Sequence, residues 1–219
     1  MPPMSEDERI TGGMKSQLGD RRRALARDER GLGWKLGFGT SAAMQKLGTD
    51  APLVGYLLQS GRLESGAVVD ISNWGNPKLE PEIVARVGED GEITAIGAAI
   101  ELADLDPGAS DPEAILAANI FQRHVLLSPV TEGAGTGDVE LRVAVNGEEV
   151  AATEDVTEAT GDLDELVRHV AKTLKAAGET LERGDMVICG SIVPALDVAP
   201  GDEVEVSLEP LGSLTVSFE

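Results

Sequence analysis

Two glutamates flank a proline in the segment LEPEIVARV (79–87), which has the pattern of a β-strand. Side chains two residues apart point to the same face of a strand, so Glu80 and Glu82 are predicted to lie about 7 Å apart at the backbone. Two ionised carboxylates that close repel each other unless a cation lies between them or one of them takes up a proton. Pro81 lacks an N–H, which indicates a sheet edge or a β-bulge.

A third carboxylate can join this pair. Glu101 lies in AAIELAD (98–104), a strand-like run that follows the turn GEDG (88–91) and returns the chain toward the first strand. Three carboxylates without thiolate or imidazole make an all-oxygen site, which suits Mg²⁺ or Mn²⁺. The pattern alone leaves a second interpretation open and favours it: the two glutamates lie on the solvent face of a strand, as is common in acidic proteins.

A lysine nearby in the sequence is equally ambiguous. The segment WKLGF (34–38) alternates, with Trp34, Leu36 and Phe38 on one face and Lys35 on the other. This predicts a short strand with one buried face. From the pattern alone, Lys35 is an exposed strand lysine.

The elements that must position these residues belong to one β-rich domain with about three helices. The predicted helices run from Ile10 to about Asp28, from a capping motif at Ser110 to about His124, and from Leu163 to Leu174 with an end at Gly178. Short strands and turns are expected between Pro52 and Asp70, a hairpin at Asn146–Gly147, and three further strands over 186–219.

The composition is that of a globular protein with an acidic surface. Among 219 residues, 18 Lys and Arg stand against 39 Asp and Glu, a net charge of −21. This charge argues against binding to nucleic acids or anionic membranes, and an acidic substrate would need a local cation. Cys189 is the only cysteine, so a disulfide framework is excluded. The first residues are unlike a secretory signal and no apolar run suits a membrane helix, so we expect a soluble, cytoplasmic protein.

Several segments in the right order resemble the 2-keto-4-pentenoate hydratase and 4-oxalocrotonate decarboxylase family, which belongs to the fumarylacetoacetate hydrolase superfamily. The resemblance covers most of the chain. The segments that carry it are GWKLGFGTSAAMQKLGTDAPLVGYLL (33–58), NPKLEPEIVARVG (76–88), AAIELAD (98–104), LRVAVNGEEV (141–150) and LERGDMVICGSIVPALDVAPGDEVEVSLEPLGSLTVSF (181–218).

The resemblance implies an α+β fold, a β-rich roll or sandwich like the fumarylacetoacetate hydrolase C-terminal domain. An N-terminal helical segment (1–30) would precede a catalytic domain (31–219). The resemblance also implies that Glu80, Glu82 and Glu101 bind Mg²⁺ or Mn²⁺ and that the chain forms homo-oligomers. The resemblance assigns the role of active-site lysine to Lys35. It also implies that Asn119 and Arg123 bind the substrate, and the alternative for Arg123 is an ordinary residue at a helix end.

The activity implied by the resemblance is that of a divalent-metal-dependent lyase acting on a small 2-oxo or 2-hydroxy-2,4-dienoic acid in aromatic catabolism. Hydration is the leading reaction, and decarboxylation of a 2-oxo acid or hydrolysis of an acylpyruvate are alternatives. The hydrolase branch uses a catalytic histidine for which no matching segment is found. Gln59, Ser60 and the segment 121–123 depart from the family pattern, which leaves a further alternative: an altered member that acts as a partner subunit.

Overall fold

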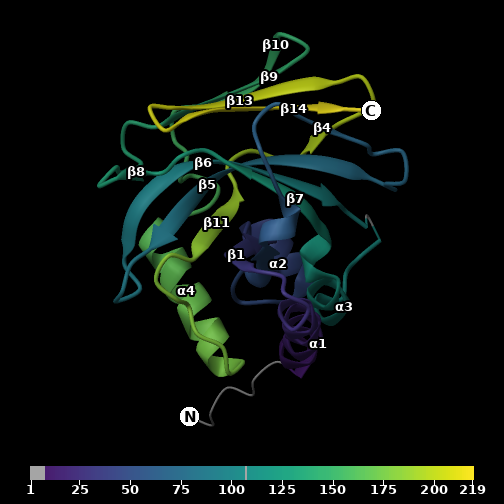
Figure 1. The fold of residues 1–219 in the computed structure, drawn as a ribbon, viewed down its shortest axis with the longest axis vertical. Coiled ribbons are helices and arrows are strands. Elements are labelled where there is room, and N and C mark those ends of the chain that lie inside the picture. The colour runs from purple at the N-terminus through teal and green to yellow at the C-terminus, as the bar shows by residue number, and fades with distance from the viewer. Residues whose placement is uncertain (1–7, 107) are drawn as a thin grey trace.

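The computed structural model describes residues 8–106 and 108–219, which form two β-sheets and a group of helices (Figure 1). The larger sheet has nine strands: β1 (Gly31–Gly37), β2 (Leu53–Leu58), β3 (Arg62–Leu63), β5 (Pro77–Val87), β6 (Ile93–Asp104), β7 (Gln122–Leu127), β8 (Thr131–Glu132), β11 (Met186–Ser191) and β12 (Leu196–Asp197). The smaller sheet has five strands: β4 (Ala67–Val69), β9 (Glu140–Val145), β10 (Glu148–Thr153), β13 (Glu203–Glu209) and β14 (Gly212–Phe218).

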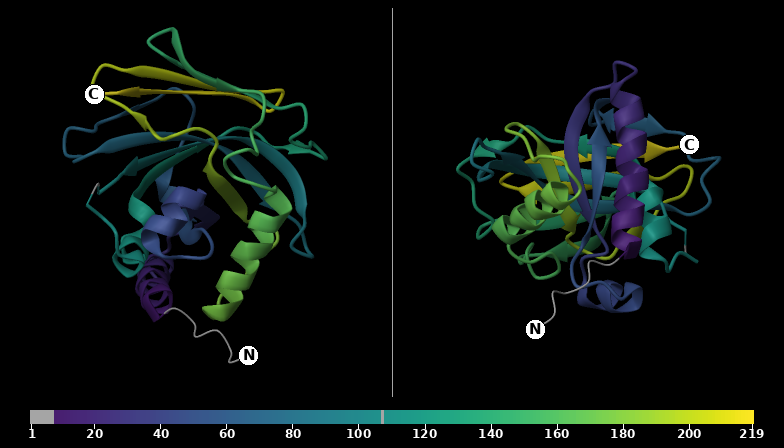
Figure 2. Two further views of the ribbon diagram at one scale, coloured as in Figure 1. Left: turned by 180° about the vertical axis from the view of Figure 1, so that it is seen from behind. Right: turned by 90° about the horizontal axis from the view of Figure 1, so that it is seen from below.

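The order of strands in the larger sheet is β2-β1-β11-β5-β6-β7-β3, with β12 paired to β5 and β8 paired to β6. The sheet is curled, and the helices lie inside its concave face while the smaller sheet covers the opposite face (Figures 1 and 2). The smaller sheet has the order β10-β9-β13-β14-β4, and its strands β13 and β14 contact β6. The central strands of the larger sheet are therefore covered on both faces.

Within residues 8–106 and 108–219, four α-helices lie on the concave side: α1 (Glu8–Leu25), α2 (Ser41–Leu47), α3 (Pro112–Ala117) and α4 (Leu163–Ala176). Helix α1 packs against α3 and β2, whereas α4 packs against β11 and β1 (Figure 2). The local sequence explains helix α4. Asp162 accepts a hydrogen bond from the N–H of Glu165 at its start, and buried Leu166, Val170 and Leu174 give it one apolar face.

The predicted α+β class and β-rich architecture are confirmed. The two strands around the acidic residues exist as β5 and β6, and Asn146 and Gly147 form the turn of the β9–β10 hairpin with φ of 53° and 82°. Helix α2 was not predicted, although Thr40 caps its start and Gly48 ends it in the left-handed conformation. Among the described residues, no helix combines the length and apolar character needed to cross a bilayer.

The prediction of a helix from Ser110 to about His124 is wrong in its second half. Helix α3 ends at Ala117, and three consecutive residues, Asn119, Ile120 and Phe121, adopt positive φ of 49°, 54° and 62°. The chain then enters β7, whose residues pair with β6 and bury Val125, Leu126 and Leu127. Apolar residues in succession suit a strand that is covered on both faces, and this outweighs the helical spacing.

The prediction of one buried face for residues 34–38 is also wrong. Trp34, Lys35 and Leu36 in β1 are all buried, at 1%, 1% and 2% exposure. The alternation itself is correct, but both faces of β1 are covered by other parts of the chain. Lys35 is therefore a buried cation, which needs a partner of opposite charge.

Candidate metal centre

Three glutamates meet on the concave face of the larger sheet. Along β5 the residues Leu79, Ile83 and Ala85 alternate with Glu80 and Glu82, so the two carboxylates share one face. The apolar residues of this alternation belong to the main core, which extends to the smaller sheet. The carboxylates consequently point to the other side, into the curl of the sheet.

The third glutamate comes from the neighbouring strand. Glu101 in β6 is the direct cross-strand partner of Glu80, and Glu82 pairs with Ala99 two positions further on. Residues paired in this way lie on the same face of the ladder. One carboxylate oxygen from each of Glu80, Glu82 and Glu101 lies within 4.8 Å of the others. The predicted convergence of the three carboxylates is thus observed in the fold.

A bulge in β11 helps to orient Glu82. Ile188 pairs with Val84 and Ser191 pairs with Glu82, so the β11 side contains an extra residue between these two pairs. Gly190, at φ 94°, donates its N–H to Glu82 Oε2 at 2.7 Å. The sheet edge or bulge predicted at Pro81 is wrong: β5 is an interior strand, its pairing with β6 is regular around Pro81, and the bulge lies in β11.

Lys35 reaches the cluster from β1, which is separated from β5 by β11 in the sheet. Its Nζ donates a hydrogen bond to Glu101 Oε1 and lies 3.5 Å from the carbonyl oxygen of Ile120. The neighbouring strand β2 contributes Gly55, where a Cβ would come within 2.9 Å of Lys35 Cγ. The absence of a side chain at Gly55 leaves the space that the lysine stem occupies.

Two carboxylate oxygens of the cluster lack a hydrogen-bond partner among the described residues: Glu82 Oε1 and Glu101 Oε2. Both side chains are 0% exposed, and a buried ionised oxygen without a partner is strongly destabilising. Three carboxylates and one ammonium also leave an excess of two negative charges. The donor set therefore fits a divalent cation that prefers oxygen ligands.

The surroundings raise the pKa of all three carboxyl groups. Burial raises the pKa of Glu80, with a smaller opposing effect from Lys35. Burial and the charges of Glu101 and Glu80 raise the pKa of Glu82 well above its usual range. Burial raises the pKa of Glu101 to about 7, although the ammonium of Lys35 opposes this shift. A cluster of this kind holds protons near neutral pH until a cation replaces them.

A cavity of about 420 Å³ opens beside the cluster. Lys35, Glu80, Cys189 and Gly190 form part of its lining, so the carboxylate cluster is reached from this space. Its volume lies in the range of small-molecule sites. Burial and the nearby Glu82 raise the pKa of Cys189, which keeps this thiol protonated and unreactive.

Asn119 and Arg123 do not appear among the described residues that line this cavity. Both ends of the Asn119 side chain bind the backbone of Tyr56: Oδ1 accepts from its N–H at 2.9 Å and Nδ2 donates to its carbonyl at 3.0 Å. Arg123 is exposed, pairs with Asp104 at 3.1 Å and lies over the ring of Trp74. Their predicted contact with substrate remains a prediction, whereas their observed contacts are with the protein itself.

Sequence reasoning missed two contributors to the site. Ile120 follows Asn119 in the left-handed segment, and its carbonyl faces Lys35. Gly190 supplies the N–H that holds Glu82. A glycine within the apolar strand segment MVICGSI is a signal of a bulge, so Gly190 could have been found. The sequence around Ile120 carries no comparable signal, because β-branched residues rarely adopt positive φ.

Comparisons with known proteins place this chain among enzymes. The family model described as fumarylacetoacetate (FAA) hydrolase C-terminal matches residues 39–219. A 4-oxalocrotonate decarboxylase of Pseudomonas sp. (strain CF600) is 28% identical over 215 residues, covering 90% of this chain and 81% of the relative. The 2-keto-4-pentenoate hydratase 2 of Dechloromonas aromatica (strain RCB) is 24% identical over 211 residues, covering 89% and 80%.

A solved structure agrees with these sequence comparisons. The 4-oxalocrotonate decarboxylase from Pseudomonas putida G7, complexed with magnesium and adipate, superposes with a TM-score of 0.84 at 25% identity. The similarity covers 93% of this chain and 83% of that one.

Proposed function

The chain belongs to the fumarylacetoacetate hydrolase C-terminal family, and from this premise we propose that it is a divalent-metal-dependent lyase for a small 2-oxo or 2-hydroxy-2,4-dienoic acid. The homologues are hydratases and decarboxylases, and one related structure contains magnesium. Hydration is the leading reaction in this proposal. The assignments of Glu80, Glu82 and Glu101 as metal ligands and of Lys35 as the catalytic residue are part of the proposal.

The observation that carries the proposal is a carboxylate cluster with two buried, unpartnered oxygens, of which one member, Glu80, lines a cavity. Burying two carboxylates and partly burying a third is costly for stability alone, and a chain that needed only a core would fill this space with apolar residues. The cluster is instead kept beside a cavity that can admit a small molecule. This combination supports a metal site with catalytic use.

Substrate binding and proton transfer are assigned to different groups of the site. A divalent ion in this site supplies Lewis-acid stabilisation of the negative charge that develops on a 2-oxo acid as a proton moves or a C–C bond breaks. Lys35 Nζ can donate a hydrogen bond to the substrate's carboxylate or C2 oxygen and can carry a proton at this position. The apolar lining at Leu36, Phe38 and Ile120 excludes bulk water from the reacting atoms.

Decarboxylation is the second candidate reaction, favoured by the 0.84 TM-score to a decarboxylase. Product analysis separates the two reactions: hydration yields a 4-hydroxy-2-oxo acid, and decarboxylation releases CO₂. The partner-subunit alternative rested on Gln59, Ser60 and residues 121–123. Gln59 and Ser60 are exposed in a 3₁₀ turn outside the described cavity lining, so this departure leaves the lining itself unchanged.

The proposal is tested by following loss of the 2-hydroxypenta-2,4-dienoate chromophore with chelator-treated protein before and after Mg²⁺ or Mn²⁺ is restored. Activity is expected only with metal, and Glu82→Gln is expected to lower kcat/KM at least about 100-fold because it removes one ligand charge. Glu205→Gln, at an exposed position of β13, is the matched control and is expected to leave kcat/KM unchanged. Turnover that resists the chelator would contradict the proposal.

A further inference from the structure

Most of the side chains that line the cavity are apolar, and we call them the apolar wall. Strand β1 and the segment after it contribute Leu36 and Phe38, and α4 contributes Leu166. The other apolar side chains of this wall are Ala43, Pro52, Leu105, Ile120, Ala159, Val193, Pro194 and Ala195. A substrate whose reactive end lies at the carboxylate cluster would place the rest of its carbon chain against these residues.

The part of the lining that the structure describes offers no second cation. Among the described residues of its lining, Lys35 and Glu80 are the ones with side chains that are normally charged at neutral pH. Lys35 is already hydrogen-bonded to Glu101 at the reactive end. A carboxylate at the far end of a substrate would therefore lose its hydration without gaining an ion pair.

The hydroxyl groups of the lining are engaged with the backbone. Ser191 Oγ donates to the carbonyl of Val193 at 2.6 Å, and Thr160 Oγ1 donates to the carbonyl of Val156 at 3.4 Å. Thr40 Oγ1 accepts from the N–H of Ala43 as the cap of α2. A neutral hydroxyl that already donates must break that bond to serve a second anionic group, which applies to Ser191 and Thr160. The O–H of Thr40 can donate, but a single neutral hydroxyl replaces only part of the hydration of a carboxylate.

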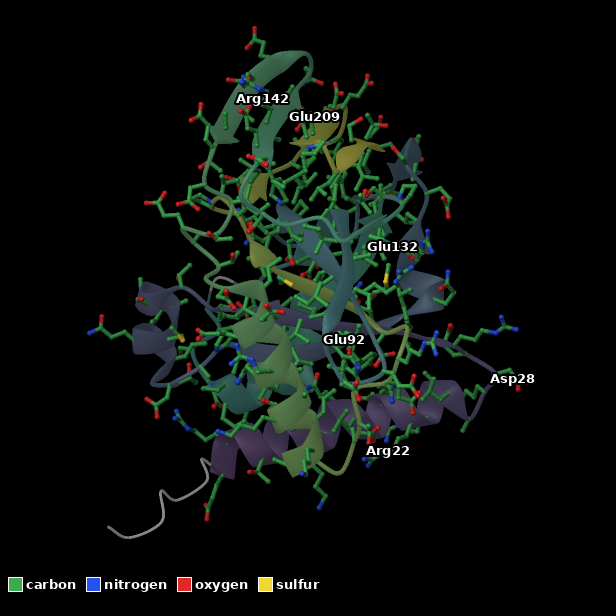
Figure 3. All side chains as sticks on the ribbon, turned by 90° about the vertical axis from the view of Figure 1, so that its left-hand side faces the viewer. Arg22, Asp28, Glu92, Glu132, Arg142 and Glu209 are labelled. Atoms are coloured by element: carbon green, nitrogen blue, oxygen red, sulfur yellow. The ribbon has the colours of Figure 1, made fainter. Side chains whose placement is uncertain are left out.

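An acidic residue lies beside the exposed part of the lining. Ala159 is exposed and lines the cavity, and its sequence neighbour Glu158 is exposed as well. The chain as a whole has a net charge of −21, and exposed carboxylates such as Glu209 lie on other parts of the surface (Figure 3). Repulsion from this surface adds to the lack of a partner inside the cavity.

We propose that this cavity selects 2-oxo acids with an uncharged, apolar tail and rejects dicarboxylates of the same length. The inference rests on the proposed function, since it concerns the part of the substrate beyond the 2-oxo acid head. It also favours hydration, because a substrate whose far carboxylate leaves as CO₂ must first bring that carboxylate into the cavity. The specificity determinant is the apolar wall rather than the metal centre.

The test compares two inert ligands that differ at one end, 2-oxohexanoate and 2-oxohexanedioate, by calorimetric titration of Mg²⁺-loaded protein. The monocarboxylate is expected to bind about 100-fold more tightly. This difference in affinity should persist at 0.5 M salt, where the range of electrostatic repulsion from the surface is reduced to roughly a few ångströms. Equal or tighter binding of the dicarboxylate would overturn the inference while leaving the proposed function intact. Failure of both ligands to bind would overturn the proposed function as well.

A substitution in the wall provides an independent test. Ala159→Arg places a cation at the exposed part of the lining and is expected to improve the affinity for 2-oxohexanedioate relative to 2-oxohexanoate about 10-fold. Ala159→Gln has a long polar side chain without the charge and is expected to leave this ratio at the wild-type value. An unchanged ratio in a folded Ala159→Arg protein would count against the assignment of this wall to the substrate tail.

Discussion

Lys35 Nζ donates a hydrogen bond to Glu101 Oε1 although their strands, β1 and β6, are separated by β11 and β5 in the sheet. The larger sheet is curled (Figure 1), and this hydrogen bond joins two side chains across its concave face. The ammonium group of Lys35 is thus the counter-charge for a cluster of three carboxylates. Removal of the ammonium would therefore affect every member of the cluster.

Lys35→Met is expected to destabilise the metal-free protein by about 3 kcal/mol at pH 8, because the carboxylates lose their buried counter-charge. The loss should be smaller at pH 5, where protons can neutralise the carboxylates. With metal bound, kcat should fall at least about 100-fold if this lysine carries a proton or holds the substrate. Urea denaturation and initial rates measure the two effects. Lys172→Met, at an exposed position of α4, is the control that should change neither quantity.

The metal-free protein should lose stability as the pH rises from about 5 to about 8. The folded-state pKa of Glu101 is raised from 4.5 to about 7, and those of Glu80 and Glu82 are raised too. The folded state then holds more protons than the unfolded state in this window, so the free energy of unfolding decreases with increasing pH.

Metal ions should reverse this trend, because they replace the protons that these carboxyl groups hold. The increase in Tm caused by Mg²⁺ or Mn²⁺ is expected to be larger at pH 8 than at pH 5.5, as measured by thermal melts at constant ionic strength. Glu101→Gln should flatten the pH dependence and reduce the metal effect. A metal effect that is equal at both pH values would be inconsistent with ligation by these carboxylates.

Asn119→Ala should destabilise the protein by about 2 kcal/mol, because both hydrogen bonds to the backbone of Tyr56 are lost. The carbonyl of Ile120 then loses its fixed position near Lys35, so kcat should fall while the Kd for Mg²⁺ stays constant. Asn119→Gly separates the two causes: glycine suits the positive φ at this position but lacks the side-chain hydrogen bonds. A Gly variant that behaves like wild type would show that backbone conformation alone is what matters.

Gly190→Ala should weaken the affinity for Mg²⁺ about 10-fold, because its N–H orients Glu82 and a side chain at φ 94° shifts this backbone. Gly184→Ala is a closely matched control: Gly184 has φ 90°, and an added Cβ meets nothing within 4 Å at either position. Both variants should lose about 1 kcal/mol of stability from the strained conformation. Calorimetric titration should show a metal defect in Gly190→Ala alone.

The sequence was sufficient to predict that Glu80 and Glu82 share a face and that a chain reversal returns Glu101 to them. Alternation within a strand is a local property, so it can be read from neighbouring residues. Burial of the same face was not predictable from the pattern, because the helices that cover it come from distant segments. The sequence pattern placed Lys35 on the surface for this reason. Only the family resemblance corrected the interpretation of Lys35 and of the glutamates.

The positions of Asn119 and Ile120 could not be predicted for a different reason. The apolar spacing after Ser110 continues to fit a helix, whereas the observed backbone is left-handed at three successive residues that are not glycine. Such a conformation persists only where surrounding contacts hold it, here including the two hydrogen bonds from Asn119 to Tyr56. Those contacts join segments more than sixty residues apart, and local patterns carry no information about them.

Strand β11 is inserted between β1 and β5, yet the ribosome makes it long after both of them. Until Met186–Ser191 has been synthesised, β1 and β5 of the nascent chain therefore lack the strand that pairs with both of them. Their backbone N–H and C=O groups on that side stay without their partners in the sheet. Gly190 arrives with this same strand, so Glu82 cannot be oriented before β11 pairs with β5. The proposed metal site and the larger sheet are consequently expected to be completed in one late step of the biogenesis of this protein.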